Sequence, residues 1–178
     1  MGMPDGDVLL GPQVLLRAPK VEDAEHLFAS VTSDPNVTEY LSWTPHPDVD
    51  ETLRVITELF NVGDDHTWLI ALRYSGEVVG ELGYRQPQRH AVNIGYCLGR
   101  QWWGRGIMSE AVSVLLQQLQ QDSSVFRASA ACHVDNVGSA RVLERCGLAL
   151  EGRLVRYLVF PNLGPEPQDC LLYARAMR

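Results

Sequence analysis

Three segments of alternating apolar and polar residues, separated by short turns, constrain the fold of this chain more than any other feature. Residues 68–72 and 78–84 flank a turn that contains Gly76, and residues 92–98 follow a second polar turn at 85–90. Alternation with a period of two is typical of strands with one buried face, and a turn this short joins antiparallel neighbours. The pattern predicts a run of adjacent antiparallel strands in the middle of the chain.

Segments with helical spacing lie on both sides of these strands. Residues 21–31, 53–60, 107–122 and 139–146 carry apolar residues three and four positions apart. Further strands are predicted at 14–16 and at 125–132, and two or three more in the C-terminal part of the chain. The predicted order is βααβββαβαββ. Interleaved helices and strands predict an α/β (α+β) fold, in which helices pack on the faces of a mixed sheet within one domain over residues 1–178.

Composition limits the classes of protein to consider. The chain has 178 residues, of which 46% are hydrophobic and 21% charged, as in one ordinary globular domain. The helical stretch with the most apolar residues, 107–119, is interrupted by polar side chains, so no membrane span is expected. Residues 1–7 contain two acids and no base, unlike a secretion signal, and a cytoplasmic location is therefore expected.

The cysteines and histidines give no metal-site pattern. Four cysteines lie 35, 14 and 24 positions apart without a C-x-x-C pair, so they are expected to be buried free thiols. The five histidines lack H-E-x-x-H spacing, and no metal is predicted, although any one of them could act as an acid or base.

Charge is distributed unevenly along the chain. Residues 1–66 carry 13 acids against 3 bases, and residues 67–178 carry 12 arginines against 9 acids. The acidic first third favours a cationic partner at one place and an anion at another, or it forms only solvated helix faces. Direct nucleic-acid binding is not expected, because a stripe of phosphate-neutralising residues is missing.

The loop at residues 101–106, Q-W-W-G-R-G, lies between a predicted strand and the first turn of a predicted helix. Gly104 and Gly106 allow the backbone to turn sharply with its N–H groups pointing into one concavity, and the helix dipole adds partial positive charge. A third glycine and a G-K-[ST] sequence are both absent, which argues against a Rossmann fingerprint and a nucleotide-hydrolysing P-loop. The anion expected here is a pyrophosphate held without metal.

The same loop matches the signature [QR]-x-x-G-x-[GA] at every specified position, and the sequence resembles the GNAT superfamily of acetyl-CoA-dependent N-acetyltransferases. I-G-Y-C-L at 94–98, N-x-x-S at 136–139, L-E-R-C-G-L at 143–148 and L-E-G at 150–152 resemble the branch that contains the ribosomal-protein alanine N-acetyltransferases. The resemblance covers nearly the whole chain. It implies a mostly antiparallel mixed sheet flanked by helices, and it leaves open whether the chain forms a homodimer.

The resemblance also implies acetyl-CoA as the cofactor and assigns residues to it. The backbone of Tyr96, Cys97 and Leu98 is expected to pair with the pantetheine arm as another strand would. Asn136 is expected to orient the pantetheine. The residues expected around the pyrophosphate are Trp103, Gly104, Arg105, Gly106, Ile107, Met108 and Ser109. For the Arg105 side chain, a phosphate contact and a solvent-facing position both remain open.

Ser139 is the proton donor that the resemblance implies, because it would lie near the sulfur of the departing thiolate. A helix N-cap or first-turn hydroxyl is the alternative interpretation of this residue. Many superfamily members use a tyrosine seven residues after the asparagine instead. That position is Leu143 here, so the tyrosine mechanism is not expected.

Glu81 is the first candidate for the general base, since a carboxylate inside a sheet strand needs a partner or a task. A surface carboxylate is the alternative, and Glu39 is the second candidate base. Two carboxylates found in the branch are replaced here, one before I-G-Y by Asn93 and one beyond L-E-G by Leu158.

The resemblance implies an enzyme that moves an acetyl group to a primary amine by direct attack, and a protein N-terminal α-amine is the expected acceptor. An α-amine, with a pKa of roughly 8, can be deprotonated by a weaker general base than a lysine or polyamine with a pKa of about 10.4. A small cationic amine such as a polyamine or aminoglycoside, and a non-catalytic CoA-binding regulatory module, are the alternatives. The resemblance also implies that residues 21–63 form one wall of the acceptor site. Tyr40 and Trp43 would either line this wall or pack beneath it. The acids that could steer a positively charged acceptor are Glu22, Asp34, Glu39, Asp48, Asp50 and Glu51.

Overall fold

The computed structural model describes residues 8–178. Residues 1–7, where no secretion signal is expected, lie outside the described part of the chain.

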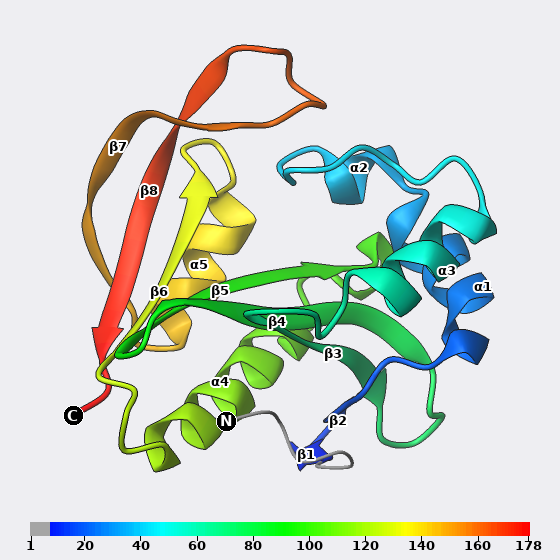
Figure 1. Ribbon diagram of the computed structural model, residues 1–178, viewed down its shortest axis with the longest axis horizontal. Coiled ribbons are helices and arrows are strands. Elements are labelled where there is room, and N and C mark those ends of the chain that lie inside the picture. The colour runs from blue at the N-terminus through cyan, green and yellow to red at the C-terminus, as the bar shows by residue number, and fades with distance from the viewer. Residues whose placement is uncertain (1–7) are drawn as a thin grey trace.

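Within residues 8–178, eight strands form a single sheet with the order β1-β2-β3-β4-β5-β6-β8-β7 (Figure 1). Neighbouring strands are antiparallel except β5 and β6, which are parallel. The strand bounds are β1 Leu9–Leu10, β2 Val14–Arg17, β3 Asp65–Leu72, β4 Val78–Gln88, β5 Ala91–Leu98, β6 Arg127–His133, β7 Ala149–Val159 and β8 Pro167–Ala176.

The helices alternate with these strands in groups. Their bounds are η1 Val21–Asp23, α1 Ala24–Leu27, η2 Phe28–Thr32, α2 Pro35–Thr38, α3 Val49–Glu58, η3 Arg100–Trp102, α4 Ile107–Gln121 and α5 Val137–Arg145. Side-chain caps fix several ends: Asp34 accepts a hydrogen bond from the Asn36 N–H at the start of α2, and Asp48 accepts one from the Glu51 N–H at the start of α3. Gly147, with φ of 78°, follows the end of α5.

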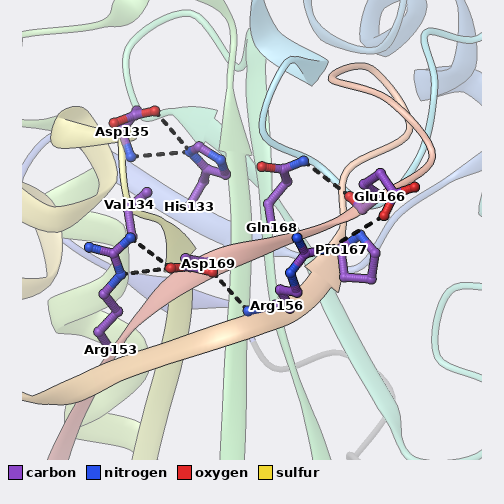
Figure 2. A pocket seen from close by; sticks show the side chains of 9 residues that line it. All are labelled: His133, Val134, Asp135, Arg153, Arg156, Glu166, Pro167, Gln168 and Asp169. Carbon is purple, nitrogen blue, oxygen red and sulfur yellow. Dashed lines mark hydrogen bonds and ion pairs between the residues drawn. The ribbon is translucent and has the colours of Figure 1, made fainter.

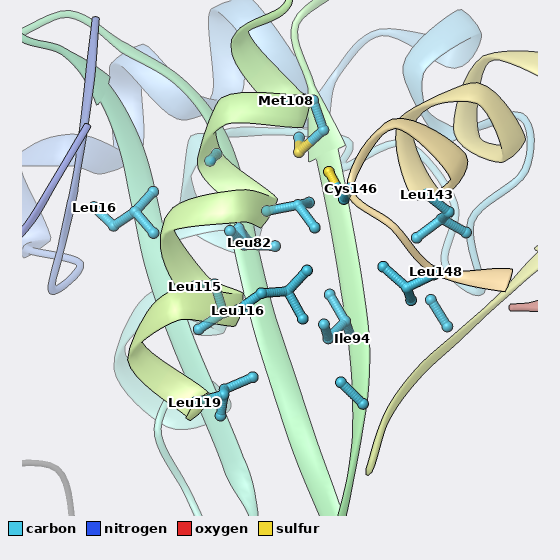
Figure 3. Close-up of a cluster of buried hydrophobic side chains, with 14 of the residues drawn as sticks. Leu16, Leu82, Ile94, Met108, Leu115, Leu116, Leu119, Leu143, Cys146 and Leu148 are labelled. Atoms are coloured by element: carbon cyan, nitrogen blue, oxygen red, sulfur yellow. The ribbon is translucent and has the colours of Figure 1, made fainter. Parts of the chain in front are cut away.

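The two faces of the sheet carry different helices and separate apolar cores. Helices α4 and α5 cover one face, where Leu82 and Ile94 from the strands pack with Leu115 (Figure 3). Helices α1 and α3 cover the opposite face, where Leu69 and Cys97 lie in the same cluster as residues of these helices. We call these the α4 face and the α1 face. Because successive strand residues point to opposite faces, even-numbered residues of β5 belong to the α4 face and odd-numbered ones to the α1 face.

Strands β5 and β6 pair over only three residues and then part. The paired positions are Ala91 with Arg127, Val92 with Ala128 and Asn93 with Ser129. Beyond them the two strands diverge, as Figure 1 shows. Among the described residues none is paired with residues 94–98 on the side away from β4, so this stretch of backbone borders an opening inside the sheet.

The predicted order of the long elements is confirmed, with differences at the ends of elements. The helix predicted over 21–31 is a succession of η1, α1 and η2, and the short helix α2 was not predicted. Strand β4 reaches Gln88, so the turn predicted at 85–90 is shorter. Helix α5 begins at Val137 rather than at Ser139 because Asn136 caps it. The four cysteines are free and buried, as predicted.

Candidate active site

The opening between β5 and β6 is the geometric centre of the candidate site. Its register places residues 36 apart in sequence at the same level, since Asn93 lies opposite Ser129. Continued along the diverging strands, this register puts Tyr96 level with Cys132 and Cys97 level with His133. The opening therefore has Tyr96 and Cys132 beside it on the α4 face, and Cys97 and His133 beside it on the α1 face.

On the α4 face, hydroxyl groups gather at the opening. The Tyr96 Oη lies 2.9 Å from Ser139 Oγ and 3.3 Å from the Ser139 carbonyl oxygen, two possible acceptors for its one proton. Burial raises the pKa of the Cys132 thiol, and an interaction with the Ser139 hydroxyl opposes that rise. Ser139, in the first turn of α5, therefore contacts Tyr96, which borders the opening on the β5 side.

Asn136 holds this serine in place. Its side-chain oxygen accepts the Ser139 N–H at 3.0 Å and so caps α5. Ser139 is thus a first-turn hydroxyl, one of the two interpretations of the sequence, and it also faces the opening. Leu143, one turn later, is fully buried in the core of the α4 face.

On the α1 face, Glu81 lies beside Cys97, the β5 residue that borders the opening. It pairs with Leu69 of β3 on one side and with Cys97 of β5 on the other. Its side chain is half-buried. Burial raises the pKa of this carboxyl to about 7, and the charge of Asp65 adds to the rise, while an interaction with Cys97 opposes it. A carboxyl with a pKa near neutrality can both accept and release a proton under physiological conditions.

His133 lies on the same face across the opening. It is 5% exposed, and its Nδ1 accepts the Asp135 N–H at 3.1 Å. Tyr40 stacks on the imidazole with ring centroids 4.9 Å apart, and Phe160 meets it edge-on at 5.1 Å. Because Nδ1 accepts, the neutral ring carries its proton on Nε2. The three rings form a wall on the α1 face.

The loop between β7 and β8 is hydrogen-bonded to the end of α2 and to the segment after it, and so closes one side of the site. Asn162 Nδ2 donates to the carbonyl oxygens of Thr38 at 2.6 Å and Trp43 at 2.8 Å. Figure 1 shows this loop extending toward α2. The site therefore has one wall from the first half of the chain and one from its C-terminal hairpin.

At the end of β5 the chain forms an open concavity in front of α4. Gly104 and Gly106 have φ of 73° and 80°, and a Cβ atom on either would meet nothing within 4 Å. Glu110 N–H makes the first hydrogen bond of the α4 ladder, to the Gly106 carbonyl. The N–H groups of residues 107–109 precede it and are not used within the helix. This arrangement fits an anion, as predicted from the sequence.

The two tryptophans of the loop differ in their environment. Trp103 is 49% exposed, and its Nε1 donates to the Leu98 carbonyl at 2.7 Å. Trp102 packs against the core, and its buried Nε1 has no hydrogen-bond partner among the described residues. The Arg105 guanidinium lies 4.9 Å from the centroid of the Trp102 ring, and this side chain is exposed at the loop.

The acidic side chains of the first third have mixed surroundings. Asp34 and Asp48 cap helices, and Glu51 is paired with Arg54 at 2.7 Å. Glu39 is exposed beside the ring wall, and its charge, after burial, contributes to raising the pKa of Tyr40. The remaining steering candidates, Glu22 and Asp50, are exposed. Trp43 packs on His46 with ring centroids 5.0 Å apart.

A polar pocket of about 420 Å³ lies beside the ring wall rather than in the opening (Figure 2). Its arginines are engaged with acids: Arg153 contacts Asp169 at 2.7 Å, and Arg156 contacts Glu166 at 3.5 Å. His133 lines it, but the residues predicted for the cofactor do not.

The predicted site residues thus gather around one opening. Sequence analysis placed Tyr96 there for its backbone alone and did not single out its hydroxyl. It also did not single out His133, Phe160 or Asn162, which complete the α1-face wall. The N-x-x-S spacing carried a signal that could have placed Ser139 more accurately, because an asparagine three residues before it is a typical N-cap.

Comparison with known proteins identifies similar chains. The family model described as an acetyltransferase (GNAT) domain matches residues 13–149. An uncharacterised N-acetyltransferase p20 from Bacillus licheniformis is 31% identical over 156 residues, which are 85% of this chain and 87% of that protein. The [ribosomal protein uS5]-alanine N-acetyltransferase of Escherichia coli is 30% identical over 86 residues, 47% of this chain and 44% of that protein. The match to this second relative therefore spans less than half its length.

Solved structures show the same fold. A structure of RimL, a ribosomal L7/L12 alpha-N-protein acetyltransferase, in complex with coenzyme A, superposes with a TM-score of 0.83 at 24% identity. The superposition covers 96% of this chain and 98% of that chain.

Proposed function

This chain belongs to the GNAT acetyltransferase family, and we propose that it transfers the acetyl group of acetyl-CoA to the α-amine of a protein N-terminus. The observation that carries this proposal is the opening between β5 and β6. It has a carboxyl group with a pKa near 7 beside it on one face of the sheet and a pair of hydroxyl groups on the other. Acetyl transfer to an amine needs a proton acceptor and a proton donor at two different atoms, and the two faces supply them.

The residues around the opening fit coenzyme A in two places. The glycine loop and the first turn of α4 would hold the diphosphate, with N–H groups of residues 104–109 as donors. The free side of β5 would hold the extended pantetheine arm through backbone hydrogen bonds at Tyr96 and Cys97. The Leu98 carbonyl already accepts from Trp103, so this carbonyl would contribute little. Bound acetyl-CoA supplies an activated acetyl group as a thioester.

Glu81 is the proposed general base. It lies on the α1 face, where Tyr40, His133 and the acidic Glu39 form the wall of an acceptor site. An α-amine with a pKa of roughly 8 is close to the Glu81 value of about 7, so proton transfer from the amine to this carboxylate is only slightly uphill. The carboxylate would hold the ammonium group at the opening and take its proton.

Ser139 is the proposed proton donor for the sulfur. It lies on the α4 face, opposite the proposed amine site, and its backbone is fixed by the Asn136 cap. A hydroxyl in this position can donate a hydrogen bond to a developing thiolate without moving.

The choice of an N-terminal α-amine rests on this modest base and on the similarity to proteins named as ribosomal-protein N-terminal acetyltransferases. Small cationic amines remain the alternative substrate class, supported by the exposed acids Glu22, Glu39 and Asp50. A reducing, cytoplasmic environment is proposed with the function, and four buried free thiols support it.

The test is release of free CoA thiol, followed with a chromogenic thiol reagent, for a panel of acceptors. The panel contains peptides that begin with alanine or serine, the same peptides with a blocked N-terminus and an internal lysine, a polyamine and an aminoglycoside. Peptides with a free N-terminus should react, and mass spectrometry should place the acetyl group on the α-amine. Faster reaction of the polyamine or aminoglycoside would change the substrate class. CoA binding without thiol release for any acceptor would favour a non-catalytic CoA-binding module.

A further inference from the structure

Tyr96 is the polar side chain closest to the proposed proton donor. Its ring packs against the core of the α4 face, and its Oη lies 2.9 Å from Ser139 Oγ. Burial raises the pKa of this phenol above its ordinary value, so the hydroxyl keeps its proton. Tyr96 therefore stays a hydrogen-bond donor throughout the neutral pH range.

The direction of the Ser139 hydroxyl proton depends on which acceptor the Tyr96 hydroxyl donates to, the Ser139 carbonyl oxygen or Ser139 Oγ. If Tyr96 donates to the Ser139 carbonyl, 3.3 Å away, the serine hydroxyl is free to donate back to the phenol oxygen and turns from the opening. If Tyr96 donates to Ser139 Oγ, at the shorter 2.9 Å, the serine proton must point elsewhere. The shorter distance favours the second arrangement.

Cys132 borders the opening on the side opposite Tyr96. It lies on β6, level with Tyr96, and the Ser139 hydroxyl opposes the rise that burial causes in the pKa of its thiol. The serine hydroxyl therefore lies beside the opening, in contact with the Tyr96 phenol. A second sulfur lying in the opening would approach the same hydroxyl.

We propose that Tyr96 is a positioning residue: its hydroxyl donates to Ser139 Oγ and so keeps the serine proton directed into the opening, toward the sulfur of the acetyl donor. This inference rests on the proposed function, in which Ser139 donates to that sulfur. Tyr96 does not touch the reacting atoms and acts only through Ser139.

Tyr96→Phe removes the hydroxyl and retains the ring, and Tyr173→Phe is the matched control. Tyr173 is also buried in this core, but its hydroxyl donates to Glu144 at 3.0 Å. Loss of one neutral hydrogen bond should lower kcat of Tyr96→Phe by about tenfold and leave KM for acetyl-CoA within about twofold of the wild type. Tyr173→Phe should retain the wild-type kcat.

The double variant separates positioning from packing. If Tyr96 acts only through Ser139, Tyr96→Phe with Ser139→Ala should be no slower than Ser139→Ala alone. Losses that multiply would overturn the proposal, as would a wild-type kcat for Tyr96→Phe.

A binding measurement gives a readout that needs no acceptor. A serine proton directed at the sulfur favours the thiolate, so the affinity for CoA, measured by calorimetry, should increase from pH 7 to pH 9 by about threefold more in the wild type than in Tyr96→Phe. Desulfo-CoA, which lacks the sulfur, should show no such difference between the two proteins.

The ionisable groups around the hydroxyl pair are Cys132 on β6, Cys146 after α5, Glu144 on α5 and Tyr173 on β8. Burial raises the pKa of both thiols and raises the pKa of Tyr173 to about 12. The Ser139→Ala variant retains all four groups and should lose the same pH response as Tyr96→Phe.

Equal pH responses for CoA in the wild type and Tyr96→Phe would overturn the positioning role, even if acetyl transfer proceeds. Weaker desulfo-CoA binding by Tyr96→Phe would show a packing role instead. Absence of transfer to every acceptor would overturn the proposed function, and the CoA titration would still decide the role of Tyr96.

Discussion

Replacing Glu81 with glutamine tests two things: whether this carboxyl is the general base, and how much its ionisation in β4 lowers the stability of the fold. Burial in β4 raises the pKa of this carboxyl from 4.5 to about 7. The folded protein therefore binds the proton more tightly than the unfolded chain does. At about 1.4 kcal/mol per pKa unit, ionisation of Glu81 lowers the free energy of unfolding by about 3 kcal/mol. The protein therefore has its full stability below pH 4.5, where the carboxyl is protonated, and loses this amount as the pH rises through about 7.

The Glu81→Gln variant should consequently be more stable than the wild type at pH 8.5 and similar to it at pH 4. Its kcat/KM at pH 8 should fall by about 100-fold or more, the usual contribution of a general base. In the wild type, activity should rise with pH through about 7 as Glu81 ionises, and this limb should be absent from the variant.

Two measurements check this prediction: thermal unfolding at both pH values, and thiol release between pH 5.5 and 9 with saturating acetyl-CoA. Glu39→Gln is the matched control, because Glu39 is the other candidate carboxylate and is exposed. The reasoning is refuted if Glu81→Gln keeps wild-type turnover and the limb near pH 7, particularly if Glu39→Gln loses both.

Three further substitutions test the donor side and the sheet. Gly104→Asp should weaken CoA binding in calorimetry by about 100-fold, because a carboxylate would face the diphosphate, whereas Gly104→Ala should not repel it; equal affinities would show that the anion binds elsewhere. Ser139→Ala should lower kcat by about 100-fold with little change in KM, and unaltered turnover would remove this serine from the mechanism. Gly80→Ala should lower the free energy of unfolding by about 1–3 kcal/mol, since its Cβ would lie 2.4 Å from the Cys97 carbonyl oxygen; an unchanged melting temperature would contradict this.

The features that sequence analysis predicted are those that local patterns encode. Alternation identified β3, β4 and β5, and the two glycines of the loop indicated the concavity in front of α4. Strand β4 is longer than predicted because residues 86–88, a proline between two glutamines, extend beyond its last pair with β3 at Arg85. No burial pattern marks such an extension.

The ring wall could not be predicted because its members are distant in the sequence. Tyr40, His133 and Phe160 come from three separate parts of the chain, and only the strand order brings them together. The contact between the Tyr96 and Ser139 hydroxyls was missed for a related reason. It spans 43 residues and depends on how β5 and β6 diverge.

The pleat of β4 and β5 has a consequence for how such an enzyme can change. Odd-numbered positions such as Glu81 and Cys97 lie on the face where we propose that the amine binds, and even-numbered positions such as Leu82 and Tyr96 lie on the face of the proposed proton donor. Substitutions confined to the odd-numbered positions of these strands could therefore change which amine is accepted without changing the residues that would contact the thioester. A library built on that rule would explore new acceptors without first having to rebuild the coenzyme cleft.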